Sequence, residues 1–138
     1  MDNSGHYRNI LIATDGSENS KEAINSGIEF AKLTGAKVHA IYVINAPWER
    51  EAYRYLREIG KKTTNEVKQI GDKNGVDVET HLLEGNPAEQ IIDYAENNDI
   101  DLIVMGTHGE SGLRRFMMGS VAQKVVRSSI IEVLVARG

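Results

Sequence analysis

The sequence predicts an open, doubly wound α/β fold, in which a mainly parallel, five-stranded sheet carries helices on both faces. Two observations predict it. Short apolar runs alternate with longer segments in which apolar residues recur every three or four positions, as expected for strands followed by helices. Several of the short runs are apolar throughout, which is typical of strands buried on both faces. Strands and helices that alternate in this way form such a sheet through right-handed crossovers.

The first half of the chain supplies two strands and two helices. Residues 10–13, Ile-Leu-Ile-Ala, predict the first strand, and Ser17 is expected to cap a helix that ends at Gly35. Residues 38–44 predict the second strand. A long amphipathic helix then extends to Gly75. Its apolar side is formed by Ala52, Leu56, Ile59, Thr63, Val67 and Ile70.

The second half continues the alternation with three strands and two helices. Residues 76–82 alternate between apolar and polar side chains, which predicts a half-exposed strand at a sheet edge. Asn-Pro-x-Glu at residues 86–89 is a start signal for the third helix. Residues 102–105 predict a buried fourth strand. Residues 121–126 carry the apolar face of a fourth helix, and residues 133–136 predict the last strand.

Length, charge and composition narrow the class of protein. The 138 residues fit a single domain, residues 1–138, which is long enough to bury its own core. The net charge of −4 gives no electrostatic footprint for nucleic acid or for an anionic membrane, so neither partner is expected. The lack of cysteine excludes thiol catalysis and thiolate metal sites. With no apolar stretch long enough to span a bilayer and no apolar leader, we expect a cytoplasmic protein.

A glycine-rich connection between the fourth strand and the fourth helix is the main functional signal. Gly106, Gly109, Gly119 and Ser120 form the pattern G-x2-G-x9-G-S. Glycines let backbone N–H groups approach an anion, and the following helix N-terminus adds unpaired N–H groups and partial positive charge. A flexible surface loop is the alternative, but a structural connection of this length is uncommon. The pattern favours phosphate binding.

Asp15 is the second candidate. The first and fourth strands are expected to be the central pair, so Asp15 and Gly106 should face one crevice at the carboxyl ends of the strands. Two interpretations of Asp15 stay open: a residue of a tight turn, or a hydrogen-bond acceptor for a ribose hydroxyl or an exocyclic amine. Arg114 or Arg115 is expected to reach the outer phosphates, with solvated surface charges as the alternative.

Other kinds of site are disfavoured. His6, His39, His81 and His108 show no spacing typical of metal ligands and are expected to be structural or solvated, His108 excepted because it lies in the glycine loop. There is no P-loop lysine and no nucleophile elbow. Because no general base stands beside the glycine loop, the sequence favours binding, or at most slow hydrolysis, over fast catalysis.

Three motifs in order resemble the ATP-binding branch of the universal stress protein family: Ile-Leu-Ile-Ala-Thr-Asp-Gly-Ser at residues 10–17, Gly-Thr-His-Gly at 106–109 and Gly-Ser-Val-Ala at 119–122. The resemblance spans the chain. It implies a Rossmann-like fold of the adenine nucleotide alpha hydrolase-like type and a cytoplasmic homodimer that binds ATP or another adenine nucleotide with Mg²⁺ or Mn²⁺. It also implies a nucleotide-dependent switch in stress response, at most a weak ATPase. A nucleotide-independent protein-interaction module of the same fold is the alternative, disfavoured by the intact glycines.

The resemblance also implies which residues form the site. Ala13, Asp15 and Val43 would surround the base and ribose, while the glycines and the start of the fourth helix would hold the phosphates. The complete implied set is Ala13, Thr14, Asp15, Val43, Met105, Gly106, Thr107, His108, Gly109, Gly119, Ser120 and Val121.

A homodimer through residues 133–136 is expected on independent grounds, because an apolar last strand at a sheet edge invites pairing with a second copy. Glu132 stands where the family that the chain resembles commonly has Pro.

Overall fold

The computed structural model of the protein describes residues 6–18, 20–46, 49–107 and 119–137. Five strands and four helices alternate along the described residues, and the strands form one parallel sheet in the order β3-β2-β1-β4-β5. The predicted fold class is thereby confirmed. The elements are β1 (Asn9–Ala13), α1 (Ser20–Thr34), β2 (Lys37–Ile44), α2 (Arg50–Lys73), β3 (Val78–Glu84), α3 (Pro87–Asn97), β4 (Leu102–Gly106), α4 (Ser120–Ser128) and β5 (Glu132–Ala136).

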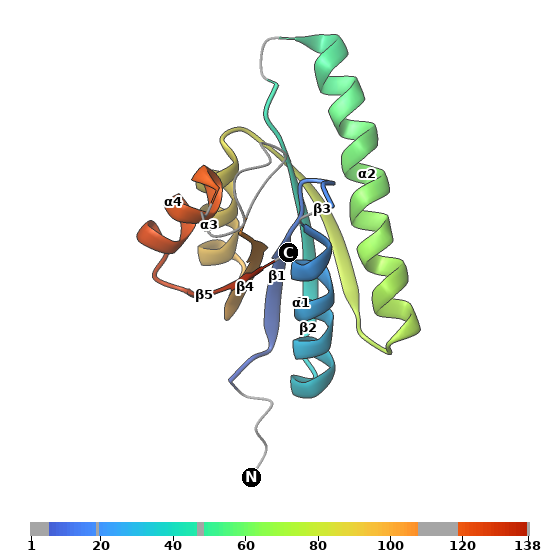
Figure 1. Cartoon of the computed structure of the whole chain (residues 1–138), viewed down its shortest axis with the longest axis vertical. Coiled ribbons are helices and arrows are strands. Elements are labelled where there is room, and N and C mark those ends of the chain that lie inside the picture. Colours follow the sequence, from blue (N-terminus) through green and yellow to red (C-terminus); the bar gives the residue numbers. More distant parts are fainter. Residues whose placement is uncertain (1–5, 19, 47–48, 108–118, 138) are drawn as a thin grey trace.

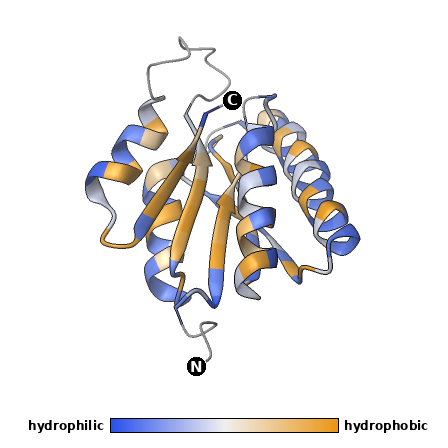
Figure 2. Cartoon of the chain, turned by 60° about the horizontal axis from the view of Figure 1, so that its bottom comes forward, coloured by the Kyte–Doolittle hydropathy of each residue, from blue (hydrophilic) through white to orange (hydrophobic). Residues whose placement is uncertain are grey.

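The sheet lies between two helical layers, α1 and α2 on one side and α3 and α4 on the other (Figure 1). Successive side chains of β1 enter opposite layers: Ile10 and Ile12 pack with α1, whereas Leu11 packs with α3 and α4. All three are fully buried. The central strands β1 and β4 are accordingly hydrophobic along most of their length, while hydrophobic residues follow one side of each long helix (Figure 2).

The strand order creates a topological switch point beside β1. From β1 the chain continues to β2 and β3 in one direction, then returns to place β4 and β5 on the other side. The predicted β1–β4 pairing is confirmed, with Ile10 opposite Leu102. The edge positions of β3 and β5 are confirmed as well. In such sheets, ligands bind outside the carboxyl ends of the strands at the switch point.

Two predicted boundaries differ from the structure. Helix α1 begins at Ser20, so Ser17 is not its cap. The physical reason is that Asp15 Oδ1 accepts hydrogen bonds from both the N–H and the hydroxyl of Ser17, at 2.9 and 2.6 Å, and holds it in the preceding turn. Strand β3 comprises Val78–Glu84 rather than residues 76–82.

The start signal of α3 is confirmed. Asn86 is the N-cap, and its side-chain oxygen accepts a hydrogen bond from the N–H of Glu89 at 3.2 Å. Pro87 occupies the first turn, where its missing N–H costs nothing. Since α3 follows β3, this capped end lies at the carboxyl edge of the sheet.

The register of β2 and β3 brings two of the histidines together. His39 is paired with Glu79, and Ile41 with His81, so the three polar side chains occupy neighbouring positions on one face. The rings of His39 and His81 stack with a centroid separation of 6.2 Å, and the ring of Tyr94 from α3 contacts both. The sequence spacing of the histidines is not typical of metal ligands and did not reveal this grouping, because strand pairing joins positions that are remote in the sequence.

None of the helices within the described ranges is long and apolar enough to cross a membrane.

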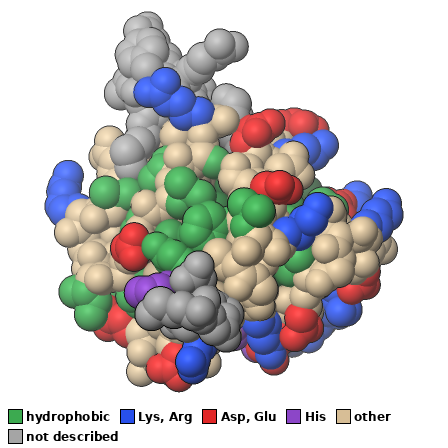
Figure 3. All heavy atoms as spheres, turned by 90° about the horizontal axis from the view of Figure 1, so that it is seen from below, with side chains coloured by type: hydrophobic (Ala, Val, Ile, Leu, Met, Phe, Trp, Pro, Cys, Tyr) green, Lys and Arg blue, Asp and Glu red, His purple; other side chains and the backbone are tan. Residues whose placement is uncertain are grey.

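On the face shown in Figure 3, Lys and Arg side chains are interspersed with Asp and Glu side chains around a central group of hydrophobic side chains.

Candidate functional site

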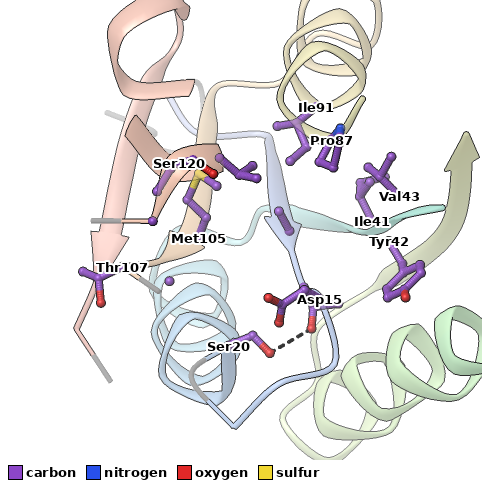
Figure 4. Close-up of a pocket in the computed structure, with 16 residues that line it drawn as sticks. Asp15, Ser20, Ile41, Tyr42, Val43, Pro87, Ile91, Met105, Thr107 and Ser120 are labelled. Carbon is purple, nitrogen blue, oxygen red and sulfur yellow. Dashed lines mark hydrogen bonds between the residues drawn. The ribbon is translucent and has the colours of Figure 1, made fainter. Parts of the chain in front are cut away.

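A cavity of about 300 Å³ opens at the carboxyl ends of β1, β2 and β4, where α3 and α4 begin. Figure 4 shows the side chains around it. Ten of the residues predicted for the site line this cavity: Ala13, Thr14, Asp15, Val43, Met105, Gly106, Thr107, Gly119, Ser120 and Val121. The other two, His108 and Gly109, lie outside the described residues, as do Arg114 and Arg115.

One side of the cavity is apolar. Val43, Pro87 and Ile91 lie together in Figure 4, at the carboxyl end of β2 and in the first turns of α3. A flat, weakly polar group such as a purine fits a surface of this kind. Sequence reasoning missed the contribution of α3. The start signal at residues 86–89 could have indicated it, because a helix that follows a parallel strand begins at the carboxyl edge of the sheet.

A chain of hydroxyl groups fixes the turn after β1. Ser20 donates to the Ser17 carbonyl oxygen at 2.8 Å, so the 3.0 Å contact between Thr14 Oγ1 and Ser20 Oγ is donated by Thr14. The N–H of Gly16 in turn donates to Thr14 Oγ1 at 3.3 Å. Gly16 has a φ of 83°, which favours glycine in this turn. Ser20 is a lining residue that sequence reasoning also missed.

Asp15 serves the turn and borders the cavity at the same time. Its Oδ1 is occupied by Ser17, whereas Oδ2 makes no hydrogen bond to any of the described residues. Asp15 is also the only charged side chain among the described lining residues. The two interpretations of Asp15 are thus compatible: one oxygen holds the turn and the other is left for a hydrogen-bond donor in the cavity.

The opposite side of the cavity carries the start of α4. The first helical hydrogen bond runs from the Gln123 N–H to the Gly119 carbonyl at 2.9 Å. The N–H groups of residues 120–122, which precede it, have no backbone acceptor within the helix. All three residues line the cavity. Unpaired N–H groups and the positive end of the helix dipole form a surface suited to an anion.

Gly119 has a different role from its neighbours. Its N–H donates to the Thr107 carbonyl, and the Thr107 N–H donates to the Ala136 carbonyl at 3.0 Å. These bonds tie the start of α4 to the ends of β4 and β5. The N–H of Gly119 is therefore already used inside the protein, and an anion would meet the N–H groups that follow it.

The arrangement can hold a ligand that is flat at one end and anionic at the other, because it combines an apolar wall, one carboxylate and a helix N-terminus. No lysine, arginine or histidine lines the cavity within the described ranges.

Comparison with known proteins shows which family the chain resembles along almost its whole length. The model of the universal stress protein family matches residues 6–137. A universal stress protein of Methanocaldococcus jannaschii is 40% identical over 141 residues, which cover 95% of this chain and 82% of the relative.

Solved structures agree with the sequence comparison. A universal stress protein of Lactobacillus plantarum superposes with a TM-score of 0.82 at 27% identity, covering 96% of this chain and 99% of the other. A universal stress protein of Archaeoglobus fulgidus in complex with dAMP superposes with a TM-score of 0.76 at 25% identity, covering 96% and 99%.

Proposed function

The chain belongs to the universal stress protein family, and we propose that it binds an adenine nucleotide in the cavity at the carboxyl ends of β1 and β4. The observation that carries the proposal is the pairing, in one cavity, of an apolar wall with a helix N-terminus, whose first N–H groups have no acceptor within the helix. The dAMP complex of the Archaeoglobus fulgidus relative supports the choice of ligand.

In this proposal the two ends of the nucleotide meet the two sides of the cavity. The adenine packs against Val43, Pro87 and Ile91, and Asp15 Oδ2 accepts a hydrogen bond from a ribose hydroxyl or from the exocyclic amine. The phosphates lie at residues 120–122, beside Gly106, where partial positive charge offsets their negative charge. ATP is the proposed ligand, because the sequence pattern G-x2-G-x9-G-S resembles that of the ATP-binding branch of the family.

A divalent ion fits the phosphate end of the site. Every polar side chain among the described lining residues offers oxygen: Asp15 has a carboxylate, and hydroxyls are supplied by Thr14, Ser20, Tyr42, Thr107 and Ser120. Of these, Thr107 follows β4 and Ser120 begins α4, so both lie at the proposed phosphate end, whereas Asp15 serves the proposed nucleoside end. Oxygen donors suit Mg²⁺ and Mn²⁺, which are held largely by the phosphates themselves. The ion would neutralise the negative charge of the phosphates, because no Lys or Arg is among the described residues that line the cavity. We propose that the bound nucleotide acts as a switch in stress response, with hydrolysis slow at most.

Release and rebinding of nucleotide test the proposal. Protein denatured after purification is expected to release an adenine nucleotide, and the emptied, refolded protein to bind ATP with Mg²⁺ in a calorimetric titration. In Asp15→Ala, we expect affinity for adenosine, AMP and ATP to fall by similar factors of about 10 to 100, because one hydrogen bond to a carboxylate at the nucleoside end is lost. A protein that ignores ATP would instead favour the interaction-module alternative.

Ser17→Ala is the matched control for Asp15. It removes the 2.6 Å hydroxyl contact in the turn but keeps the carboxylate. Nucleotide affinity in Ser17→Ala is expected to stay within about threefold of the wild type, since the N–H of Ser17 still holds Asp15 Oδ1. If Asp15→Ala and Ser17→Ala behave alike, Asp15 acts through the turn alone.

We propose further that the protein is a homodimer through β5. The strand is at the sheet edge, and Leu134 in it is 37% exposed. Glu132 at the start of the strand is exposed and accepts a hydrogen bond from the Tyr7 hydroxyl at 3.3 Å. The apolar residues that follow Glu132 lie at the sheet edge, where they can pair with a second copy.

Sedimentation equilibrium at micromolar concentration tests the dimer. The wild type is expected to be dimeric, and Leu134→Lys monomeric, because a buried ammonium in the interface lacks a partner. Leu33→Lys is the control: Leu33 is 78% exposed on α1 and is not part of the sheet edge, so its replacement should leave the dimer intact. A monomeric wild type would contradict the proposal.

A further inference from the structure

Three side chains with metal-ligating atoms lie together away from the nucleotide cavity: His39 on β2, and Glu79 and His81 on β3. One ligand atom of each lies within 4.8 Å of the others. Glu79 Oε2 is 3.7 Å from His39 Nδ1 and 3.2 Å from His81 Nε2. Ligand atoms of a tetrahedral zinc ion are roughly 3.3 to 3.5 Å apart, as bond lengths of about 2.0 to 2.2 Å require. Two of the distances are thus close to those of a formed site.

His39 is held in the tautomer that a ligand needs. Its Nε2 lies 3.0 Å from the amide oxygen of Asn9, which can only accept, so Nε2 carries the proton. Nδ1 then has its lone pair on the side of Glu79, where the Tyr94 hydroxyl donates to it at 2.8 Å. A histidine that donates its second N–H to a fixed oxygen is typical of metal sites, because the outer hydrogen bond orients the ring.

His81 has a nitrogen without a hydrogen bond. Its Nε2 is buried and, although it is 3.2 Å from Glu79 Oε2, it has no hydrogen-bond partner among the described residues. A buried ring nitrogen in this state is costly, and a bound cation would satisfy it. The side chains of His81 and Glu79 are 32% and 46% exposed, which leaves a path from solvent to the buried atoms.

The protein already places a cation against the Glu79 carboxylate. Lys37 Nζ lies 3.4 Å from Glu79 Oε2 and forms an ion pair with it. The Lys37 side chain is 39% exposed, so it can turn into solvent and leave Glu79 to a metal ion.

We propose that His39 Nδ1, Glu79 and His81 Nε2 bind one divalent transition-metal ion of the zinc type, with a further position open to water. The ion would replace the Tyr94 hydroxyl, which now donates to His39 Nδ1 at 2.8 Å. Two imidazoles and one carboxylate form a ligand set that zinc accepts, and nitrogen ligands favour it over Mg²⁺. The ion would clamp the edge strand β3 to β2 under Tyr94. None of the three ligands lines the nucleotide cavity, so the site is independent of the proposed nucleotide.

Metal titration tests the proposal on untagged protein freed of nucleotide and metal. We expect one Zn²⁺ per chain, measured by competition with a chromophoric indicator, and a tetrahedral or five-coordinate absorption spectrum with Co²⁺. Zn²⁺ should also raise the melting temperature of the wild type. His81→Ala and Glu79→Gln are each expected to weaken Zn²⁺ binding at least about 100-fold, since even outer-shell changes cost 10 to 100-fold.

Both variants change partly exposed residues of an edge strand, so they are expected to fold, which circular dichroism checks. His6→Ala is the matched control: His6 is exposed and outside the cluster, and its loss should leave Zn²⁺ affinity unchanged. Asp15→Ala should bind Zn²⁺ like the wild type. A wild type that binds no Zn²⁺, or binding that His81→Ala and Glu79→Gln leave intact, would overturn the proposal.

Discussion

Replacing Ser120 with aspartate is expected to lower ATP affinity about 100-fold without weakening the fold. Ser120 is the first residue of α4 and lines the cavity. A carboxylate there would stand where the proposed phosphates bind, and two like charges about 4 Å apart repel by roughly 4 kcal/mol near a protein surface. Because Ser120 is exposed, solvent screening reduces that value, which makes about 100-fold the realistic loss.

The same substitution favours the helix itself. A negative charge in the first turn interacts well with the helix dipole, by about 0.3 to 1 kcal/mol, so the melting temperature of the empty protein should hold or rise. Loss of affinity together with retained stability separates repulsion from unfolding.

Calorimetry with a ligand series completes the test. Affinity should fall most for ATP, less for AMP and not at all for adenosine, which has no phosphate. Ser120→Asn is the control, because asparagine has nearly the shape of aspartate but carries no charge. This variant should bind ATP within about tenfold of the wild type. Equal losses for adenosine and ATP would place the phosphates elsewhere.

Leu11→Ala is expected to destabilise the protein by about 2 to 5 kcal/mol. Leu11 is fully buried in β1, the middle strand, and packs in the core beneath α3 and α4. Neighbouring strands on both sides prevent collapse of the resulting cavity. Since domains of this size are stable by only about 5 to 15 kcal/mol, the melting temperature should fall by roughly 10 °C or more.

Urea denaturation of nucleotide-free protein, followed by circular dichroism, measures this loss without the contribution of bound ligand. Leu33→Ala makes the same chemical change at a side chain that is 78% exposed, and it should change the free energy of unfolding by no more than about 0.5 kcal/mol. Similar losses in the two variants would contradict the assigned role of β1 as the centre of the core.

Much of the fold could be predicted from the sequence because hydrophobic periodicity is a local property. The runs at residues 10–13 and 102–105 are apolar throughout, and both became buried strands next to each other. The start of α1 could not be placed, since it depends on Asp15 holding Ser17 in a turn rather than on Ser17 capping the helix. A side chain that can accept from several N–H groups leaves such a choice to the folded structure.

Some residues of the candidate site could likewise be predicted from the sequence, and others could not. Lining residues at strand ends, such as Asp15 and Gly106, could be predicted because the carboxyl ends of parallel strands meet at one edge. Ile91 could not, because its place in the cavity depends on how α3 packs over the sheet. The grouping of His39 with Glu79 and His81 depends on the register of β2 and β3. A register is set by the packing of whole strands, so no local pattern reveals it.

The central place of β1 has a consequence for how the chain assembles. During synthesis, β1 can pair with β2 early, but its other neighbour, β4, begins only at Leu102. Until that residue leaves the ribosome, one edge of this buried apolar strand has no partner, and contacts this distant along the chain are slow to form. The nascent protein therefore depends on its last third to protect its first strand from aggregation.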